Sequence, residues 1–366
     1  MVPVRIRATV ASLTHSRRTP PVKKALFNLA FSAALSSASL PADACTRLIY
    51  ETGAKSYMVG RTMDWMVDPK SDLWAFPKGM ARDGAVPGAI KWTAKHGSVI
   101  SSFYNLATVD GTNDAGLVAN VLYLVESDYG DPAASKKPKL SVGAWAQYVL
   151  DNFGTVAEAV AALQKEPFAI VAPDMPDGHK ATGHMAIADS SGDSAIFEYI
   201  GGKLVIHHGA QYRVMTNSPS YDQQLAINTY WNTVGGLQFL PGTARAADRF
   251  ARISWNLNAA AKETDPRLAT ATTFSLIRAV SVPLGIADPK QPNIAATVWR
   301  TVADLQAKRY YFESAYNPAI FWVDLEKVLP AAGGKPMKLD LGERPMLSGE
   351  VSGKFVGAEP FRFISH

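Results

Sequence analysis

The feature that most constrains this 366-residue chain is its only cysteine, Cys45, together with the residues on either side of it. The preceding residues, Ala42-Asp43-Ala44, have the small-x-small pattern after which a signal peptidase cleaves. Cleavage there would make Cys45 the first residue of the mature protein. An N-terminal cysteine combines a nucleophilic sulfur with a free α-amine, whose pKa of roughly 7.7–8.0 suits a general base near neutral pH. The pattern therefore predicts one residue with two catalytic roles.

Residues 1–44 have the composition of a cleaved leader. Lys23-Lys24 precedes an apolar segment, residues 25–40, in the order of a secretory signal; this segment is too short and too rich in serine for a membrane span. Residues 1–21 extend further upstream than such a signal needs, and a start codon placed too far upstream would explain them. We expect a periplasmic or secreted protein that has no membrane contact after cleavage.

A cysteine that follows a signal is also the residue at which a lipoprotein is acylated, and this is the strongest non-enzymatic alternative. Lipoprotein signals resemble Leu-x-small-Cys. Here Ala42 stands at the third position before Cys45, and the acidic Asp43 stands at the second. The sequence therefore favours a catalytic cysteine over an acylated one.

The charge of the chain is concentrated in the leader. Residues 1–44 hold six of the 37 Lys and Arg residues but one of the 32 Asp and Glu residues, which leaves 31 of each in residues 45–366. This balance gives no reason to expect nucleic acid or an anionic membrane as a partner. Because no linker composition or repeat divides residues 45–366, we expect one domain there.

A predicted β-hairpin follows the cysteine. Residues 46–51 and 57–65 have strand composition, and residues 52–56 have turn composition. Folding about this turn brings Arg61 and Asp64 back toward Cys45. A guanidinium near the sulfur favours the thiolate, and a carboxylate can orient the amine. The alternative interpretation is a surface ion pair on the hairpin.

Cys45, Arg61 and Asp64 at this spacing resemble the choloylglycine hydrolase family of N-terminal nucleophile (Ntn) hydrolases, which contains bile salt hydrolases and penicillin V acylases. The resemblance extends over nearly all of residues 45–366. It implies hydrolysis of a linear amide C–N bond through a thioester acyl-enzyme. It also implies a four-layer αββα sandwich of two antiparallel sheets, whereas the sequence periodicity alone indicates only the α+β class.

Three further site residues follow from this resemblance. Asn217, in Thr216-Asn217-Ser218-Pro219, matches the family's oxyanion-hole asparagine, although an Asx turn explains the same residues. Tyr123 matches a position that lines the family's active site, but it also has the character of a core aromatic residue. Arg249, in a Leu-Pro-Gly…Arg-Phe pattern, matches a charged site residue; without the resemblance, an arginine early in a helix is typically solvated.

Strands and helices are predicted in separate blocks, which is typical of the α+β class. Helices are expected over residues 141–164, with a break at Gly154 and a cap at Thr155, from Arg249 to about Lys262, and over residues 269–282. A turn is expected over residues 110–115, and a long loop with short strands over residues 68–97. Further strands are expected over residues 98–106, 116–125, 184–189, 194–199, 203–207, 296–301, 309–314 and 319–324.

His184 offers an alternative catalytic base. A Cys–His dyad would pair it with Cys45, but His184 begins a predicted strand and no accompanying Asn or Asp signature is present. The α-amine of Cys45 therefore remains the expected base.

The predicted substrate is a small N-acyl amide. Trp65 and Trp74, near the nucleophile in sequence, are candidates for lining an apolar acyl pocket. Penicillin V, an N-acyl homoserine lactone and a conjugated bile salt all fit such a pocket; Tyr123 and a short interval before Arg249 favour the penicillin V acylase type. An exported lipoprotein or an inactive binding protein with an Ntn fold is the alternative. We expect no cofactor or metal. The sequence is compatible with a homo-oligomer and does not determine the oligomeric state.

Overall fold

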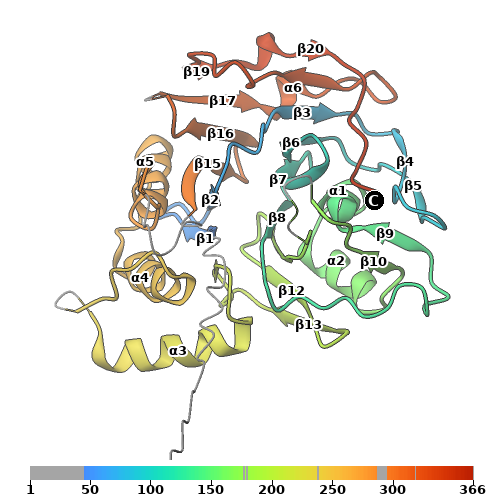
Figure 1. Cartoon of the computed structure of the whole chain (residues 1–366). Coiled ribbons are helices and arrows are strands. Elements are labelled where there is room, and N and C mark those ends of the chain that lie inside the picture. Colours follow the sequence, from blue (N-terminus) through green and yellow to red (C-terminus); the bar gives the residue numbers. More distant parts are fainter. Residues whose placement is uncertain are drawn as a thin grey trace, which may run out of the picture. The chain divides into compact units, whose positions relative to one another are not determined.

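The structure is a computed structural model that describes residues 45–175, 178, 180–236, 239–286, 295–317 and 319–365. The predicted leader, residues 1–44, lies outside the described residues, and so does the proposed cut before Cys45. Within the described residues, the chain forms two large β-sheets, two small two-stranded sheets and several helices (Figure 1).

The first large sheet has seven strands and contains the predicted hairpin. Its pairs are antiparallel except for the parallel edge pair of β17 and β19. The strands lie in the order β14 (Val214–Met215), β1 (Thr46–Glu51), β2 (Tyr57–Trp65), β15 (Ala296–Asp304), β16 (Arg309–Ser314), β17 (Ile320–Asp324) and β19 (Gly349–Glu350).

The second large sheet has nine strands, and every pair in it is antiparallel. The strands lie in the order β13 (Lys203–His208), β12 (Ser194–Ile200), β11 (His184–Ala188), β8 (Val118–Leu122), β7 (Ala107–Asn113), β6 (Ser98–Phe103), β3 (Leu73–Phe76), β18 (Met337–Leu339) and β20 (Val356–Gly357). The small sheets pair β4 (Ala81–Asp83) with β5 (Lys91–Thr93), and β9 (Lys139–Ser141) with β10 (Ala169–Val171).

Helices cover the outer faces of both sheets, which gives the expected αββα layers (Figure 1). α1 (Val142–Asn152) and α2 (Val156–Leu163) pack on the nine-stranded sheet. α4 (Ala246–Ala259) and α5 (Pro266–Arg278) pack on the seven-stranded sheet. The predicted break at Gly154 separates α1 from α2, and the Thr155 side chain caps α2 by accepting a hydrogen bond from the Glu158 N–H.

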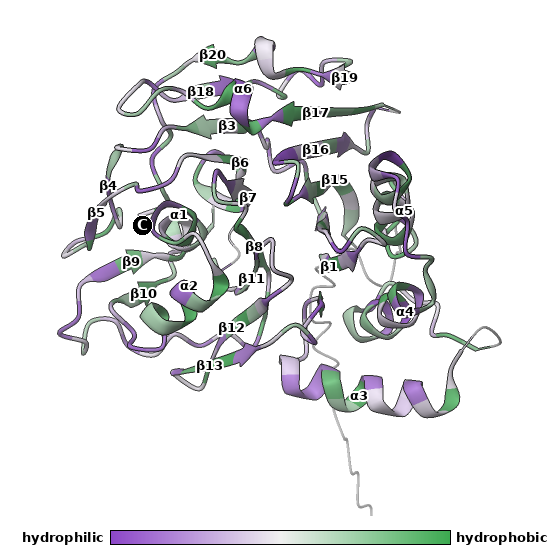
Figure 2. Ribbon diagram, turned by 180° about the vertical axis from the view of Figure 1, so that it is seen from behind, coloured by the Kyte–Doolittle hydropathy of each residue, from purple (hydrophilic) through white to green (hydrophobic). Residues whose placement is uncertain are grey.

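Two shorter or peripheral helices complete the described part. α3 (Tyr221–Val234) packs against α4, and α6 (Leu325–Val328) follows β17. α3 buries Tyr221 and Gln224, while the rest of the helix mixes hydrophilic and hydrophobic residues (Figure 2).

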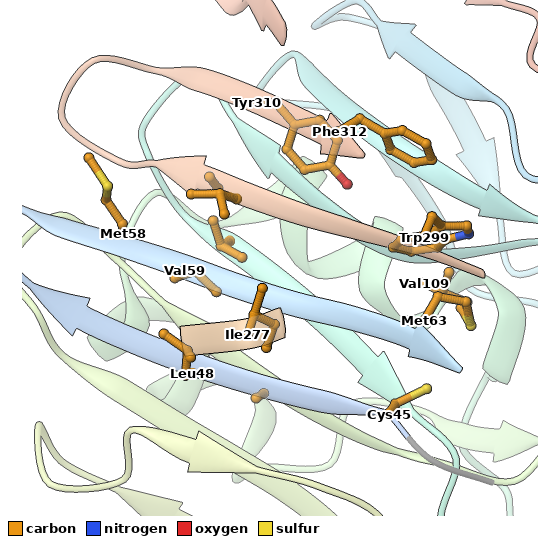
Figure 3. Close-up of a cluster of buried hydrophobic side chains, with 14 of the residues drawn as sticks. Cys45, Leu48, Met58, Val59, Met63, Val109, Ile277, Trp299, Tyr310 and Phe312 are labelled. Carbon is orange, nitrogen blue, oxygen red and sulfur yellow. The ribbon is translucent and has the colours of Figure 1, made fainter. Parts of the chain in front are cut away.

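The main apolar core lies between the two sheets and beneath α4 and α5. Along β2, alternate residues face opposite sides of the seven-stranded sheet. Val59 and Met63 point toward the nine-stranded sheet, whereas Met58 points toward α5, where the hydroxyl of Thr273 donates to its sulfur. Figure 3 shows these side chains on either side of β2, with Cys45 where β1 begins.

One predicted turn is wrong. Residues 110–113, expected in a turn, lie in β7, which pairs with both β6 and β8. Their polar side chains are satisfied inside the protein: Asn113, for example, donates to the carbonyls of Leu150 and Phe153. The turn-like composition therefore reflects buried polar contacts. By contrast, the long loop with short strands expected over residues 68–97 agrees with the structure, where it contributes β3 to the nine-stranded sheet.

Candidate active site

The β1–β2 hairpin places Cys45 and Arg61 on the face that looks toward the nine-stranded sheet. The register pairs Thr46 with Thr62 and Arg47 with Arg61, so the end of β2 returns beside Cys45 as predicted. Cys45 is buried, with 2% of its surface exposed. Its side chain lies near Met63, where β1 begins and β2 ends (Figure 3).

Asn217 and Arg249 hold the backbone of Cys45 from the other side. The Cys45 N–H donates to Asn217 Oδ1 at 2.5 Å, and Arg249 Nη1 donates to the Cys45 carbonyl at 2.6 Å. Arg249 Nη2 also donates to Asn217 Oδ1, at 2.9 Å. The structure therefore brings together residues that are 172 and 204 positions from Cys45 in the sequence.

The amide nitrogen of Asn217 points toward Tyr123. Asn217 Nδ2 donates to the Tyr123 carbonyl at 2.7 Å, just beyond the end of β8. Tyr123 itself lines the pocket next to Cys45. This places a side-chain N–H donor near the backbone of Tyr123, where the resemblance puts an oxyanion hole.

Arg61 is buried between the sheets. Its Nη2 donates to the Val121 carbonyl at 3.0 Å, and its guanidinium lies 4.6 Å from the centre of the Trp299 ring. The charge partner is Asp110 of β7, whose carboxylate oxygen is 3.7 Å from Arg61 Nε. Asp110 was not among the predicted site residues, because residues 110–115 were expected to form a turn.

Asp64 lies on the opposite face of β2 from Arg61, against hydroxyl groups. Thr297 Oγ1 donates to Asp64 Oδ1 at 2.5 Å, and Thr62 Oγ1 donates to Asp64 Oδ2 at 3.2 Å. Burial raises the pKa of Asp64 from 3.8 to about 6, although Arg249 and these hydroxyls favour the carboxylate.

A β-bulge in β15 allows two of its residues to contact side chains on opposite faces of β2. In a regular strand, two residues that are two positions apart lie on the same face of the sheet. The register of β15 against β2 shifts between Thr297 and Trp299, and this bulge places the two residues on opposite faces. Thr297 therefore reaches Asp64, while Trp299 lies over Arg61. A strand was expected over residues 296–301, but neither Thr297 nor Trp299 was predicted as a site residue.

The thiol of Cys45 is in its neutral form at neutral pH. Burial raises its pKa from 9.0 to about 11, against the opposing effect of the Arg61 and Arg249 charges. The S–H group is 3.7 Å from the Asp64 carbonyl, which it contacts as a donor. In the full chain Ala44 precedes Cys45, so the nitrogen of Cys45 is an amide without a basic lone pair. Activation of the sulfur therefore needs another proton acceptor.

A mostly apolar pocket opens beside the sulfur, between the two sheets. It encloses about 600 Å³, including space open to solvent. Trp65 lines it and makes edge-to-face contacts with Phe103 and Tyr123, whereas Trp74 packs in the core beneath α1 and does not line it. The full lining comprises Cys45, Arg61, Met63, Trp65, Phe103, Ala107, Thr108, Val109, Val121, Leu122, Tyr123, Val142, Gly143, Met175, Lys180, Ala181, Thr182 and Ile364.

His184 does not line this pocket, and both of its ring nitrogens are engaged by Glu198 and by the Thr216 carbonyl. Among the described residues, no group of three or more His, Cys, Asp or Glu side chains is placed to hold a metal ion. A search of the same part of the chain finds no helix with the length and apolar character that crossing a membrane requires.

Known proteins resemble this chain over most of its length. The family model for linear amide C–N hydrolases of the choloylglycine hydrolase family matches residues 45–329. A penicillin V acylase of Pectobacterium atrosepticum is 48% identical over 356 residues, which cover 90% of this chain and 94% of that protein.

Solved structures of two such hydrolases are also similar to this chain. A penicillin V acylase from Agrobacterium tumefaciens has a TM-score of 0.82 and 51% identity, covering 88% of this chain and all of that one. A mutant conjugated bile acid hydrolase from Clostridium perfringens has a TM-score of 0.66 at 22% identity, covering 77% of this chain and 93% of that one, and shows the shared fold alone. The described residues thus have the Ntn-hydrolase sandwich, and the chain belongs to the choloylglycine hydrolase family of linear amide C–N hydrolases.

Proposed function

We propose that this protein is exported, cleaved before Cys45, and acts as a penicillin V acylase with an N-terminal cysteine nucleophile. The observation that carries the proposal is the setting of Cys45. Its nitrogen contacts Asn217, its carbonyl contacts Arg249, and its sulfur faces an apolar pocket. The start of the family match at residue 45 supports the position of the cut. The penicillin V acylases at 48% and 51% identity support the substrate class.

The proposed reaction begins with attack of the Cys45 sulfur on the substrate's amide carbonyl. After cleavage of the leader, the α-amine of Cys45 takes the thiol proton and later returns it to the leaving amine. This produces a thioester, which water then hydrolyses with the same amine as base. The mechanism needs the α-amine because the buried thiol, with a pKa of about 11, is almost fully protonated at neutral pH.

Asn217 and the backbone N–H of Tyr123 are the proposed donors to the oxyanion that forms during attack. Asn217 Nδ2 has two N–H groups, and the Tyr123 carbonyl accepts only one of them. The other N–H is the proposed donor to the substrate. Arg61, Asp64 and Arg249 set the charge around the sulfur and the amine, and the contacts of Arg249 fix the Cys45 backbone.

The acyl group is proposed to occupy the apolar pocket. Trp65, Phe103 and Tyr123 offer ring surfaces that suit the phenoxyacetyl group of penicillin V. The aliphatic residues of the same pocket suit the acyl chain of an N-acyl homoserine lactone, which we propose as a second substrate class. A conjugated bile salt remains the alternative, and an acylated lipoprotein or an inactive binding protein is the alternative of another class.

Two measurements test this proposal. N-terminal sequencing of the exported protein is expected to give Cys-Thr-Arg-Leu, whereas a diacylated cysteine would support the lipoprotein instead. Amine release from penicillin V, an N-acyl homoserine lactone and glycocholate, measured side by side, ranks the substrates. We expect the highest kcat/KM for penicillin V; turnover of glycocholate alone would assign the protein to the bile salt hydrolases.

A further inference from the structure

We propose that His184 and Glu198 form a buried ion pair that positions Asn217 for its part in the reaction. This inference rests on the proposed function, because that function gives Asn217 the role of oxyanion donor. Neither His184 nor Glu198 lines the pocket, so both act through the backbone around Asn217 and are positioning residues.

The ring of His184 contacts an acceptor on each side. Its Nε2 lies 2.7 Å from the Thr216 carbonyl, and its Nδ1 lies 2.8 Å from Glu198 Oε1. A backbone carbonyl can only accept, so Nε2 carries a proton. Both side chains are buried, with 0% of His184 and 1% of Glu198 exposed, so water does not take over these contacts.

Glu198 is ionised, which makes its contact with His184 a second N–H donation. Both of its oxygens accept the N–H of Tyr221, at 3.2 and 3.0 Å. Burial opposes its ionisation, but the hydrogen bond from His184 and the Tyr221 N–H outweigh burial and lower the pKa of Glu198. Because a carboxylate can only accept, the ring of His184 then donates through both nitrogens, to Glu198 and to the Thr216 carbonyl.

The Glu198 carboxylate also caps the N-terminus of α3. Ser220, at the N-cap position, makes no side-chain capping bond, and Glu198 accepts the first free N–H of the helix in its place. A negative charge at a helix N-terminus is favourable. The nearby titratable groups on other elements are His207 of β13, which favours the carboxylate, and Arg47 of β1, which interacts with the Tyr221 hydroxyl.

Both peptide groups that flank Asn217 are held by dedicated donors. His184 donates to the Thr216 carbonyl on one side, and Gln224 Nε2 donates to the Asn217 carbonyl on the other. Gln224 also accepts from Thr216 Oγ1 at 2.6 Å and donates to the Pro219 carbonyl at 2.8 Å. Because two fixed peptide planes set φ and ψ of the residue between them, the side chain of Asn217 leaves the backbone in one direction.

Two substitutions at one position separate the two contacts of the ring. The amide nitrogen of asparagine reaches about as far as Nδ1, and that of glutamine reaches about as far as Nε2. His184→Asn therefore keeps a donor toward Glu198 and loses the one toward Thr216, whereas His184→Gln keeps the donor toward Thr216. We expect kcat of His184→Asn to fall about 10- to 100-fold with KM within about threefold, and His184→Gln to recover most of it.

A matched control uses another histidine of the same antiparallel strands. His208 is partly exposed and pairs with Asp193 at the surface, so His208→Asn should keep wild-type kcat. Wild-type kcat in His184→Asn, or equal losses in the Asn and Gln variants, would overturn the positioning role.

Two readouts do not depend on turnover. In wild-type protein labelled with ¹⁵N-histidine, both nitrogens of His184 should carry protons under the conditions of the activity assay; a ring with one unprotonated nitrogen would overturn the ion pair. In a crystal structure of His184→Asn, the Asn217 amide should be displaced, and an unmoved amide would contradict the proposal. If wild type releases amine from no N-acyl amide, the proposed function fails, while these two readouts still decide the inference.

Discussion

At the scale of single residues, the site depends on how the two ends of one amide are used. Asn217 Oδ1 accepts from the Cys45 N–H and from Arg249, and Nδ2 points toward Tyr123. These contacts fix which end of the amide faces the pocket, since an exchange of oxygen and nitrogen would set donors against donors.

Asn217→Ala should lower kcat by about 10²–10³ with a modest change in KM, because an oxyanion donor acts mainly on the transition state. Amine release from penicillin V by the processed enzyme measures this. Asn232→Ala, at an exposed position of α3, is the matched control and should behave as wild type. A raised KM with unchanged kcat would make Asn217 a binding or turn residue instead.

The carboxyl of Asp64 should set the acid limb of the pH profile. Burial raises its pKa to about 6, so the carboxylate is present above that pH and is lost as the pH falls through it. If the reaction needs the charge to balance Arg249 and the α-ammonium, kcat/KM should fall below about pH 6. Asp64→Asn should lower the rate at pH 7 and remove this limb; an unchanged limb would assign it to another group.

The same shift predicts a stability effect of opposite sense. A carboxyl whose folded pKa lies above its unfolded value stabilises the fold at low pH, and this contribution is lost as the pH rises through about 6. Between pH 4 and 7 the free energy of unfolding of wild type should therefore fall relative to that of Asp64→Asn, by about 2 kcal/mol. Denaturant titrations at both pH values measure the difference.

At the scale of elements, the sequence predicted best where local pattern and tertiary position agree. β1 and β2 begin and end at the predicted residues, because a strong turn separates two apolar strands. β7 was missed since its polar residues have partners that no local window contains. Gly111 is an example: a Cβ there would meet Ile100 Cγ2 at 2.5 Å and the Val99 carbonyl at 2.7 Å, so glycine at this position reflects close packing of β6 on β7.

Local sequence likewise predicts only those active-site residues that are close to one another in the chain. Cys45, Arg61 and Asp64 are close in sequence, so hairpin geometry alone brings them together. Asn217, Tyr123 and Arg249 needed the family resemblance, because their contacts with one another and with Cys45 span many strands. Asp110 and Thr297 could not be assigned from either, since the first looked like a turn residue and the second depends on a bulge.

The C-terminal segment, beyond the family match that ends at residue 329, contributes one wall of the pocket. Ile364 is anchored there: its N–H donates to the Leu106 carbonyl at 2.8 Å, and its carbonyl accepts from Ser141 Oγ at 2.5 Å. Its side chain packs so closely on Gly143 that a Cβ there would meet it at 2.9 Å.

Ile364→Ala should therefore enlarge the acyl pocket and shift the preference toward bulkier acyl groups. A change of about 10-fold in the ratio of kcat/KM between a long and a short acyl amide is expected, which is typical of a few methylene groups in an apolar pocket. Arg362→Ala, an exposed change in the same segment that leaves the pocket lining intact, is the control. An unchanged ratio would mean that the acyl group does not reach this wall.

At the scale of the whole molecule, both sheets and α4 meet around the residue that would become the N-terminus. Cys45 is buried among Asn217, Arg249 and the pocket residues, so removal of the leader would place a new α-amine inside a site that the fold has already built. Without that amine, the thiol with its pKa of about 11 has no adjacent base. Cleavage of the leader would then create the base that the reaction needs.

This coupling gives the sharpest test of the mechanism. A protein that begins at Ala44, or that carries an uncleaved tag on Cys45, should melt like the processed enzyme but have almost no amidase activity, because an amide nitrogen cannot accept the thiol proton. Its Cys45 should resist iodoacetamide at neutral pH and react only as the pH approaches 11. Cleavage immediately before Cys45 should restore both activity and alkylation at neutral pH. A histidine-based hydrolase would tolerate the extra residues, so full activity in the blocked protein, verified as intact by mass spectrometry, would rule out the α-amine as the base.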